Sequence, residues 1–456
     1  MNENSTLSDT ALSGIQGPVL HPGHADYDEE RAGFQAAYSH RPALIVGAEN
    51  ADDVRAAVAY AHTHGLGVAV QSTGHGLSAA ADGGVLITTG RMKELRIDPA
   101  ARTAHAAAGV RWAEVIEAAA AHGLAPINGS APGVGVVGYL TGGGLGILGR
   151  QFGYAADHVR ALDLVTADGT LHHVTADSEP ELFWAVRGGG GNFGAVTAVE
   201  FDLVALPEVY GGILAYADEQ VEPALAAYLE WTADLPDELT SSVALMSWPD
   251  APFAPEAFRG RYVMSVRVAF TGSAEEGERL VAPLRAVSAP LVDNLRVMPY
   301  SESHTIHSDP PHPHPYDGDN ALVTAVPAEA VRSLTGAEAR TGAIVQIKHL
   351  GGALGREPKV PNPVGHRDAR FLVTALSALF DMERDEARDV HERVLAPLVP
   401  VRVGRNLNHL FGEFGEGVVR DVYEEDALRR LGEVKAAYDP GNVFRHTYNI
   451  RPGVGS

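Results

Sequence analysis

Three glycine-rich stretches constrain this chain more than any other feature of its sequence. They occupy residues 129–149, 188–194 and 351–355. Glycine reaches backbone conformations that other residues avoid, and it lets backbone N–H groups approach an anion closely. Three such loops in one chain favour a cradle for a phosphate-bearing cofactor over ordinary turns.

Two of these stretches contain the spacing G-x-G-x-x-G, at Gly144–Gly149 and Gly189–Gly194. A Rossmann site needs a strand before the glycines and a helix after them, so that the pyrophosphate meets the helix N-terminus. The first stretch follows more glycine and threonine, and Gly153 interrupts what comes after it. The second has a helix before it and a strand after it, so we exclude a Rossmann site.

Ahead of these loops, a short apolar strand ending at Val70 leads into a tight loop that presents one histidine, His75. Its neighbours are small or polar: Gln71, Ser72, Thr73, Gly74 and Gly76. A neutral imidazole is a good nucleophile and ligand. We therefore expect the functional pocket to be built around His75.

Composition narrows the classes of protein that fit. A chain of 456 residues with 45% hydrophobic residues is long enough for two domains. A net charge of −23 argues against nucleic acid or an anionic membrane as a partner. The chain has no cysteine, its start does not read as a signal peptide, and no apolar stretch approaches membrane-spanning length. We predict a cytoplasmic protein.

The first half reads as short strands and helices around the glycine loops. A strand at 43–46 precedes a helix at 54–63, with capping chemistry at Asn50 and a stop at Gly65. Periodicity also predicts strands at 67–70, 85–88, 94–98, 103–108, 161–166, 170–174 and 195–203, and helices at 111–122 and 180–186.

The sequence changes character near Leu206, where we place a domain boundary. Beyond it, an α+β pattern with an antiparallel sheet is expected. The predicted helices lie near 219–233, 274–287, 383–396 and 419–437, and the strands near 242–248, 260–270, 343–350 and 370–376.

Several segments, in this order, resemble motifs of the FAD-linked oxidases of the vanillyl-alcohol oxidase (PCMH-type) superfamily, in its berberine bridge enzyme-like branch. Residues 71–76 resemble the R-x-x-G-H loop, and residues 129–135 the G-x-C-P-x-V-G loop. Residues 182–194 are similar to the L-x-W-A-x-R-G-G-G-x-x-F-G segment, and residues 438–444 to the Y-D-P-x-N-V-F ending.

The resemblance implies an α+β, two-domain PCMH-type fold in which an antiparallel sheet covers the flavin. It divides the chain into an N-terminal segment (1–40), an FAD-binding domain (41–208), a substrate domain (209–400) and a C-terminal segment (401–456) that rejoins the FAD-binding domain. FAD would be held by one covalent bond through His75. The other cofactor-binding residues that it implies are Gln71, Ser72, Thr73, Gly74, Gly76, Ala131, Val134, Gly135, Gly138, Gly142, Gly143, Gly144, Gly146, Gly194, Val196 and Asn449.

Some positions depart from the pattern of the branch. Its second attachment residue, a cysteine, is Ala131 here, and its loop arginine is Gln71. Val134 stands at the oxygen-gatekeeper position, where a small valine is associated with oxidases. The Y-x-N-[YF] segment, whose tyrosine is a catalytic base, reads Asn406–His409, so that tyrosine is missing.

Two residues could replace the missing base. Tyr448 could supply a phenolate, although a phenol with a pKa of about 10 needs a perturbed environment to do so. It could instead stack on the flavin or pack at the domain seam. His409 could be a second acid/base, or simply a core or surface histidine. Tyr139, Gln346 and Lys348 are candidates for substrate contact, the last two because they share one face of a strand.

A histidine-rich tract interrupted by prolines predicts a mobile loop at the pocket mouth, and we expect no metal there. Its members are His304, His307, His312 and His314, with Asp309. Arg150 and Arg187 flank glycine loops and could meet phosphate or form structural ion pairs.

These features predict an FAD-dependent oxidase that takes a hydride from an alcohol, hemiacetal or amine of a natural product or sugar and passes electrons to O2, giving H2O2. The missing base leaves open a cyclase or dehydratase of secondary metabolism without net oxidation, and a non-catalytic small-molecule binder is a third option. The expected partners are a small-molecule substrate and molecular oxygen. The identity of the substrate and the oligomeric state stay open, with a homodimer among the options.

Overall fold

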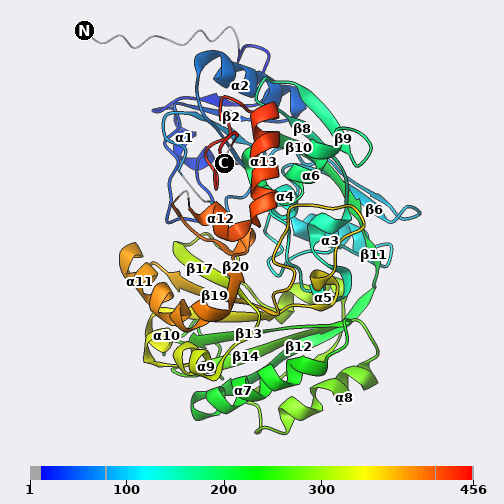
Figure 1. Cartoon of the computed structure of the whole chain (residues 1–456), viewed down its shortest axis with the longest axis vertical. Helices are drawn as coiled ribbons and strands as arrows, with labels where there is room; N and C mark the ends of the chain where they lie inside the picture. Colours follow the sequence, from blue (N-terminus) through cyan, green and yellow to red (C-terminus); the bar gives the residue numbers. More distant parts are fainter. Residues whose placement is uncertain (1–11, 78–79, 416, 454–456) are drawn as a thin grey trace.

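The computed structural model describes residues 12–77, 80–415 and 417–453. Figure 1 shows two bodies stacked along the long axis of the molecule. The upper body contains the N-terminal half of the chain, up to about residue 207, and its C-terminal end. The lower body contains the middle of the chain, residues 208–404. The sequence predicts a loose tail over residues 1–20, of which residues 1–11 lie outside the described residues.

A small sheet forms the top of the upper body. In spatial order it consists of β1 (Val19–Leu20), β2 (Leu44–Gly47), β4 (Val85–Thr88) and β3 (Val68–Gln71). Strand β4 pairs parallel with both β2 and β3. Helix α2 (Ala51–His64) packs against it, while the short α1 (Tyr27–Glu30) lies nearby. The Asn50 side chain accepts from the Asp53 N–H, and Gly65 is left-handed, so the predicted start and stop signals are confirmed.

The second sheet of the upper body is fully antiparallel. Its order is β5 (Leu95–Asp98), β6 (Thr103–Ala107), β10 (Ala195–Asp202), β8 (Val159–Val165) and β9 (Leu171–Thr175). The connecting elements are α3 (Trp112–Ala120), β7 (Leu124–Ala125), α4 (Val136–Thr141), α5 (Gly149–Phe152), α6 (Pro180–Val186) and β11 (Val204–Ala205).

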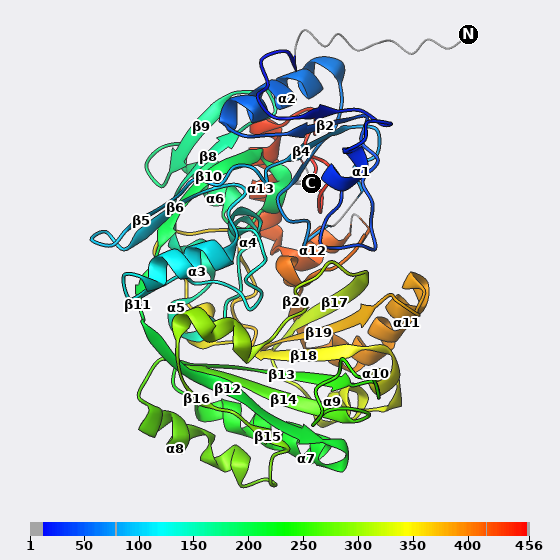
Figure 2. The same ribbon diagram turned by 180° about the vertical axis from the view of Figure 1, so that it is seen from behind.

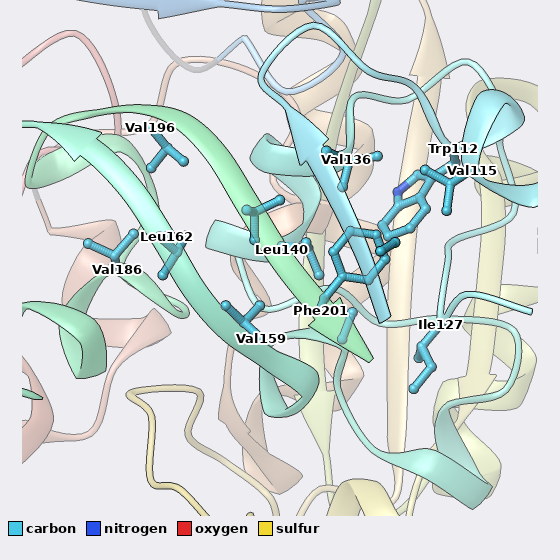
Figure 3. Packing of buried hydrophobic residues seen from close by; sticks show 14 of the residues in the cluster. Trp112, Val115, Ile127, Val136, Leu140, Val159, Leu162, Val186, Val196 and Phe201 are labelled. Carbon is cyan, nitrogen blue, oxygen red and sulfur yellow. The ribbon is translucent and has the colours of Figure 1, made fainter. Parts of the chain in front are cut away.

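The apolar core of the upper body lies between this sheet and its helices. Figure 3 shows Trp112 of α3 and Phe201 of β10 at its centre, with Leu140 of α4 close by. The Trp112 and Phe201 rings meet edge to face, with centroids 5.6 Å apart. Large aromatic side chains contribute most of the apolar burial in such a core, so this contact fixes α3 beside the sheet.

The lower body is built on a nine-stranded antiparallel sheet. Its order is β15 (Val292–Asp293), β12 (Glu208–Ala217), β14 (Tyr262–Phe270), β13 (Leu239–Ser247), β18 (Ile344–His349), β19 (Phe371–Ala378), β17 (Tyr316–Val323) and β20 (Arg402–Gly404), with β16 (Arg296–Pro299) also pairing with β12. The helices are α7 (Val221–Trp231), α8 (Ala274–Arg285), α9 (Ala328–Leu334), α10 (Ala337–Gly342) and α11 (Arg384–Leu395). The expected α+β class, with an antiparallel sheet in the second part, is confirmed.

The two faces of this sheet differ in chemistry. Val243, Val266 and Ile347 are fully buried and pack under the helices. Their sequence neighbours Ser242, Arg267 and Lys348 must point to the opposite face, because side chains alternate along a strand. Figure 2 shows that this opposite face lies below the upper body. The polar face of the sheet is therefore the floor of the space between the two bodies.

Five strands of this sheet were not expected from the sequence: β12, β15, β16, β17 and β20. Strand β12 contains Gly211 and Gly212, and in β17 the first residue, Tyr316, is followed by Asp-Gly-Asp-Asn; Gly, Asp and Asn are depleted in strands. In β17 the polar groups are bonded instead of solvated: Asp317 accepts from Tyr38, and Asp319 pairs with Arg405. These long-range partners make the strand possible, and local pattern gives no sign of them.

The C-terminal end of the chain returns to the upper body. The predicted final helix is in fact two, α12 (Val418–Val422) and α13 (Glu425–Tyr438). Lys435 and Asp439 form a fully buried ion pair, with Nζ–Oδ2 at 2.6 Å. Lys435 also donates to the carbonyl of Asn192, and Asp439 accepts the backbone N–H of Val443 and Phe444. The pair fixes the tail to the glycine loop at 188–194. The predicted boundaries at 41, 209 and 401 stay predictions, with β20 still part of the lower sheet.

We expect Lys435→Met to lower the free energy of unfolding by roughly 3–5 kcal/mol, because it leaves the Asp439 carboxylate buried without a counter-charge. Chemical denaturation followed by tryptophan fluorescence measures this. Arg429→Met removes a cation from the same helix whose partners, Asp426 and Glu433, are exposed, and it should change stability little. Equal losses in both variants would contradict a special role for the buried pair.

Candidate active site

The His75 loop is held in place by the N-terminal segment. Phe34 N–H donates to the Thr73 carbonyl at 2.9 Å, and Gln35 N–H donates to the Gly74 carbonyl at 3.0 Å. Gly74 has a φ of +68°, and a Cβ there would lie 2.6 Å from the Gly33 Cα. Neither this backbone conformation nor the close approach to Gly33 tolerates a side chain, which explains why position 74 is a glycine.

The His75 ring is oriented by contacts on two sides. Its Nδ1 lies 2.8 Å from the Thr73 hydroxyl, and the ring stacks on Phe34 with centroids 3.8 Å apart. Burial, with a contribution from the Arg111 charge, lowers the pKa of His75 to about 4, so the ring is neutral at physiological pH. When Nδ1–H donates to Thr73, the lone pair on Nε2 is free to react or to coordinate.

The loop at 129–135 lies directly beside this ring. The N-terminus of α3 anchors it: Ala113 N–H donates to the Pro132 carbonyl, and Trp112 N–H to the Val134 carbonyl. A Cβ built on Gly133 would lie 3.9 Å from His75 Nε2. The structure thus brings the loop with Ala131, Val134 and Gly135 against the His75 loop, as the sequence predicted for one site.

The residues around these loops fit an FAD molecule. In the His75 loop the buried Ser72 Oγ has no hydrogen-bond partner among the described residues, and Tyr139 Oη on α4 and Asn449 Oδ1 in the C-terminal tail have none either. Buried polar atoms are nearly always bonded, so orphaned ones indicate a missing partner. A Cβ at Gly76, in the His75 loop, or at Gly138, in α4 directly after the 129–135 loop, would meet nothing within 4 Å, so there is open space at both positions. The donors, acceptors and space are those that a large polar cofactor needs.

Other predicted glycines are explained by close packing. A Cβ at Gly142 would meet the Asn408 amide, and one at Gly143 would meet Val364. One at Gly144 would meet Tyr139 and Ala155. Gly146 and Gly194 face the backbone carbonyls of Asn128 and Val165, both at 2.6 Å. These contacts account for the absence of side chains, and a cofactor role for the five glycines stays a prediction.

The glycine loop at 351–355 does not belong with the other two. It packs on α5, where a Cβ at Gly352 would lie 2.3 Å from the Arg150 carbonyl. Its glycines are required by this close backbone contact, so the expectation of a third phosphate-binding loop is wrong. Arg150 and Arg187 are likewise structural. Arg150 donates to the carbonyls of Leu239 and Leu350, and Arg187 donates to that of Pro361.

Three further candidates are placed apart from one another. Tyr139 packs in the upper core, edge-on to Trp112 at 5.4 Å, and its ring fills the space beside Gly129. Val196 is buried in β10 opposite Leu164. Asn449 lines a hollow of the C-terminal tail together with Arg445.

On the lower side, Gln346 and Lys348 lie on the polar face of β18, as expected. Lys348 lines a cavity between the two bodies, to which the upper body contributes Ser130 and Gly146. The lower body contributes Ser242, Arg267 and His307 to the same cavity, together with Thr240, Ile306 and His349. The histidine-rich tract therefore sends His307 into the cavity, and the prediction of a mobile loop at the mouth did not foresee this.

The two catalytic candidates differ in how their polar atoms are used. His409 Nδ1 lies 2.8 Å from the Asn406 side-chain oxygen, and Asn406 is fixed to Asn320 of β17 by two hydrogen bonds. Burial and the Lys348 charge lower the pKa of His409 well below its usual value. The Tyr448 hydroxyl donates to the Gly412 carbonyl at 2.8 Å, and burial raises its pKa well above 10.

The site contains residues that the sequence analysis missed. Phe34 stacks on His75, Tyr316 donates its hydroxyl to the His75 carbonyl at 2.8 Å, and Arg267 lines the cavity. Arg267 is the one charged residue in the otherwise apolar stretch of β14, and that was a usable signal. No group of three or more His, Cys, Asp or Glu residues is arranged for a metal within residues 12–77, 80–415 and 417–453. No described helix is long and apolar enough to cross a membrane.

Comparisons with known proteins agree with this geometry. Residues 42–175 match the family described as "FAD binding domain", and residues 412–451 match "Berberine and berberine like". The (R)-6-hydroxynicotine oxidase of Paenarthrobacter nicotinovorans is 32% identical over 97% of this chain and 98% of its own. The crystal structure of 6-hydroxy-D-nicotine oxidase from Arthrobacter nicotinovorans superposes with a TM-score of 0.82 at 28% identity, covering 99% of this chain and 100% of that one. A carbohydrate oxidase from Microdochium nivale gives 0.84 at 19% identity over 97% and 99%, a likeness of fold alone.

The fold, the His75 loop and its orphaned polar atoms define an FAD-binding oxidoreductase of the PCMH type. The chain belongs to the berberine bridge enzyme-like family of FAD-linked oxidases, as its motifs indicated.

We expect the free energy of unfolding to fall as the pH drops below 6.5. His349, which lines the cavity, is buried beside Arg150, and burial lowers the pKa of its ring to about 3. The unfolded ring takes up a proton near pH 6.5, so each pH unit between the two values removes ~1.4 kcal/mol.

His349→Gln keeps an acceptor for Arg150 and should flatten this slope by ~1.4 kcal/mol per pH unit between pH 6.5 and 4.5. Urea titrations at a series of pH values measure it. Above pH 7 the difference between variant and wild type should be constant, which serves as the control. An unchanged acid slope would show that the ring is protonated in the folded protein.

Proposed function

We propose that this protein is an oxidase that takes a hydride from an alcohol, hemiacetal or amine of a natural product or sugar and passes the electrons to O2, giving H2O2. The similar proteins named as nicotine and carbohydrate oxidases support the reaction class. The small Val134 beside the His75 loop supports oxygen as the acceptor. When bound, FAD would supply the electron-poor ring that accepts the hydride.

The observation that carries the proposal is the arrangement of His75. Nδ1 of His75 is hydrogen-bonded to the Thr73 hydroxyl, and the ring stacks on Phe34. The other ring nitrogen, Nε2, faces the loop that contains Gly133. We propose that this nitrogen forms a single covalent bond to FAD, since Ala131 offers no second attachment atom. A neutral ring is needed for this role, and burial keeps His75 neutral at physiological pH.

The polar face of the lower sheet would position the substrate. Gln346 and Lys348 project from β18 toward the upper body, and the cavity beside Lys348 is roofed by Ser130 and Gly146. We propose that the substrate binds here, between the two bodies. A covered pocket of this kind strengthens every polar contact inside it.

For the proton that must leave the substrate, we propose His409 in preference to Tyr448. His409 is held by Asn406 through Nδ1, so Nε2 keeps a lone pair that can accept a proton. Tyr448 already donates its proton to the Gly412 carbonyl, and its raised pKa opposes ionisation. The lowered pKa of His409 opposes protonation in the same way, so the preference for His409 rests on the hydrogen-bond geometry.

We expect the purified protein to be yellow and to keep its flavin after denaturing electrophoresis, and His75→Ala to release the flavin under those conditions. His62→Ala, at an exposed position of α2, is the matched control and should retain it. A colourless protein that cannot bind FAD would overturn the proposal. A wild type whose flavin never bleaches anaerobically, yet which turns over substrate, would favour a cyclase or dehydratase.

We expect His409→Gln to lower kcat/KM by roughly 10²–10⁴-fold, the usual contribution of a positioned acid or base. Tyr448→Phe removes a hydroxyl that acts only as a structural donor, so the rate of flavin reduction should fall by less than about tenfold. Anaerobic stopped-flow measurements across pH separate the two roles. The reverse order of effects would assign the proton to Tyr448.

A further inference from the structure

The cavity between the two bodies is lined by two cations, neither of which forms an ion pair in the described part of the chain. Arg267 on β14 and Lys348 on β18 both lie directly opposite Ser242 of the intervening β13. Residues opposite each other on neighbouring strands have Cβ atoms about 5 Å apart and share one face. The three side chains therefore form a row across the sheet floor, and all three line the cavity.

Neither cation is paired in the described part of the chain. The Arg267 guanidinium and the Lys348 ammonium form no ion pair and no hydrogen bond there, and His307 Nδ1 beside them is buried without a partner. The buried cations Arg367 and Lys435 do have partners, Asp157 and Asp439. Arg267 and Lys348 are partly exposed, and a site that holds two unpaired cations side by side, shielded in part from water, is suited to receive an anion.

The charges around the row favour the same conclusion. Burial and the neighbouring Arg267 lower the pKa of Lys348 to about 8, and burial and both cations lower that of His307. Burial also lowers the pKa of Arg267. The Asp309 carboxylate opposes the shifts of Arg267 and Lys348, but it makes no ion pair with either in the described structure. Because the whole chain carries a net charge of −23, an anionic ligand needs such a local cationic site to approach.

We propose that Arg267 and Lys348, with His307 beside them, bind an anionic group of the substrate, so that the enzyme acts on a carboxylate- or phosphate-bearing alcohol or amine. This inference rests on the proposed oxidase function, because it places the anion next to the flavin-facing loops. Ser242 between the two cations and the neutral His307 ring, 3.5 Å apart, supply neutral hydrogen-bonding groups at the centre of the subsite. The charge-assisted hydrogen bonds that Arg267 and Lys348 would donate to the anion are stronger than hydrogen bonds between neutral groups.

The test uses the flavin-loaded enzyme and matched probes of equal size. Benzoate and phenyl phosphate are titrated against benzamide and benzyl alcohol, with binding read from the perturbation of the visible flavin spectrum. We expect at least one anion to bind at least tenfold more tightly than both neutral probes. Equal binding of charged and neutral probes would overturn the proposal, whereas a protein without flavin colour would overturn the oxidase function instead.

Variants test whether the row formed by Arg267, Ser242 and Lys348 causes the preference for anionic probes. Arg267→Met and Lys348→Met should each weaken binding of the preferred anion by ~10–100-fold and leave the neutral probes unchanged, while Arg267→Lys should keep part of the preference. Arg261→Gln removes an exposed cation just before the same strand and should change neither. If the Met variants shift the flavin reduction potential but not the preference for anions, the cations serve the reduced cofactor and the proposal fails. Retained flavin absorbance shows that each variant is folded.

Discussion

The alternation of side chains along the nine-stranded sheet is the constraint on which the rest of this molecule depends. One set of residues, such as Val243, Val266 and Ile347, buries against five helices, and the set between them faces the upper body. A slip of one residue in β14 or β18 would exchange the two sets of that strand and bury Arg267 or Lys348 in the apolar layer. The same register that makes the core therefore also delivers the polar floor of the active site.

Much of the upper body could be predicted because its signals are local. The Asn50 cap and the Gly65 stop define α2 within a few residues of sequence, and Pro180 marks the start of α6. The lower body was harder to predict, since β17 looks like a loop until its partners are known. Asp317, Asp319 and Asn320 are satisfied by residues far away in the chain, and no window of sequence contains both members of such a pair.

The glycine loops show why composition alone misleads about a binding site. At Gly76 and Gly138 the missing side chain leaves open space, whereas at Gly146, Gly194 and Gly352 it permits contact with a backbone carbonyl. All of these residues are glycines, but the physical reason for having a glycine differs between the two sets of positions. Only the three-dimensional neighbours separate a cradle from a tight packing contact, which is why the loop at 351–355 was assigned wrongly. The His75 site was predicted from an ordered set of motifs, but its partner Phe34 lies in a segment without any motif.

The buried contact between Lys435 and the Asn192 carbonyl joins residues that are 243 positions apart. During synthesis the upper body must therefore wait for nearly the whole chain to emerge before its last helix can close it. The lower sheet and its helices lie entirely within that interval, so they can form first as a continuous unit. Long-range closures of this kind slow folding more than they reduce stability. A polypeptide that ends before α13 lacks Leu431 and Val434, which belong to the apolar core of the upper body, so part of this core stays uncovered until synthesis is nearly complete.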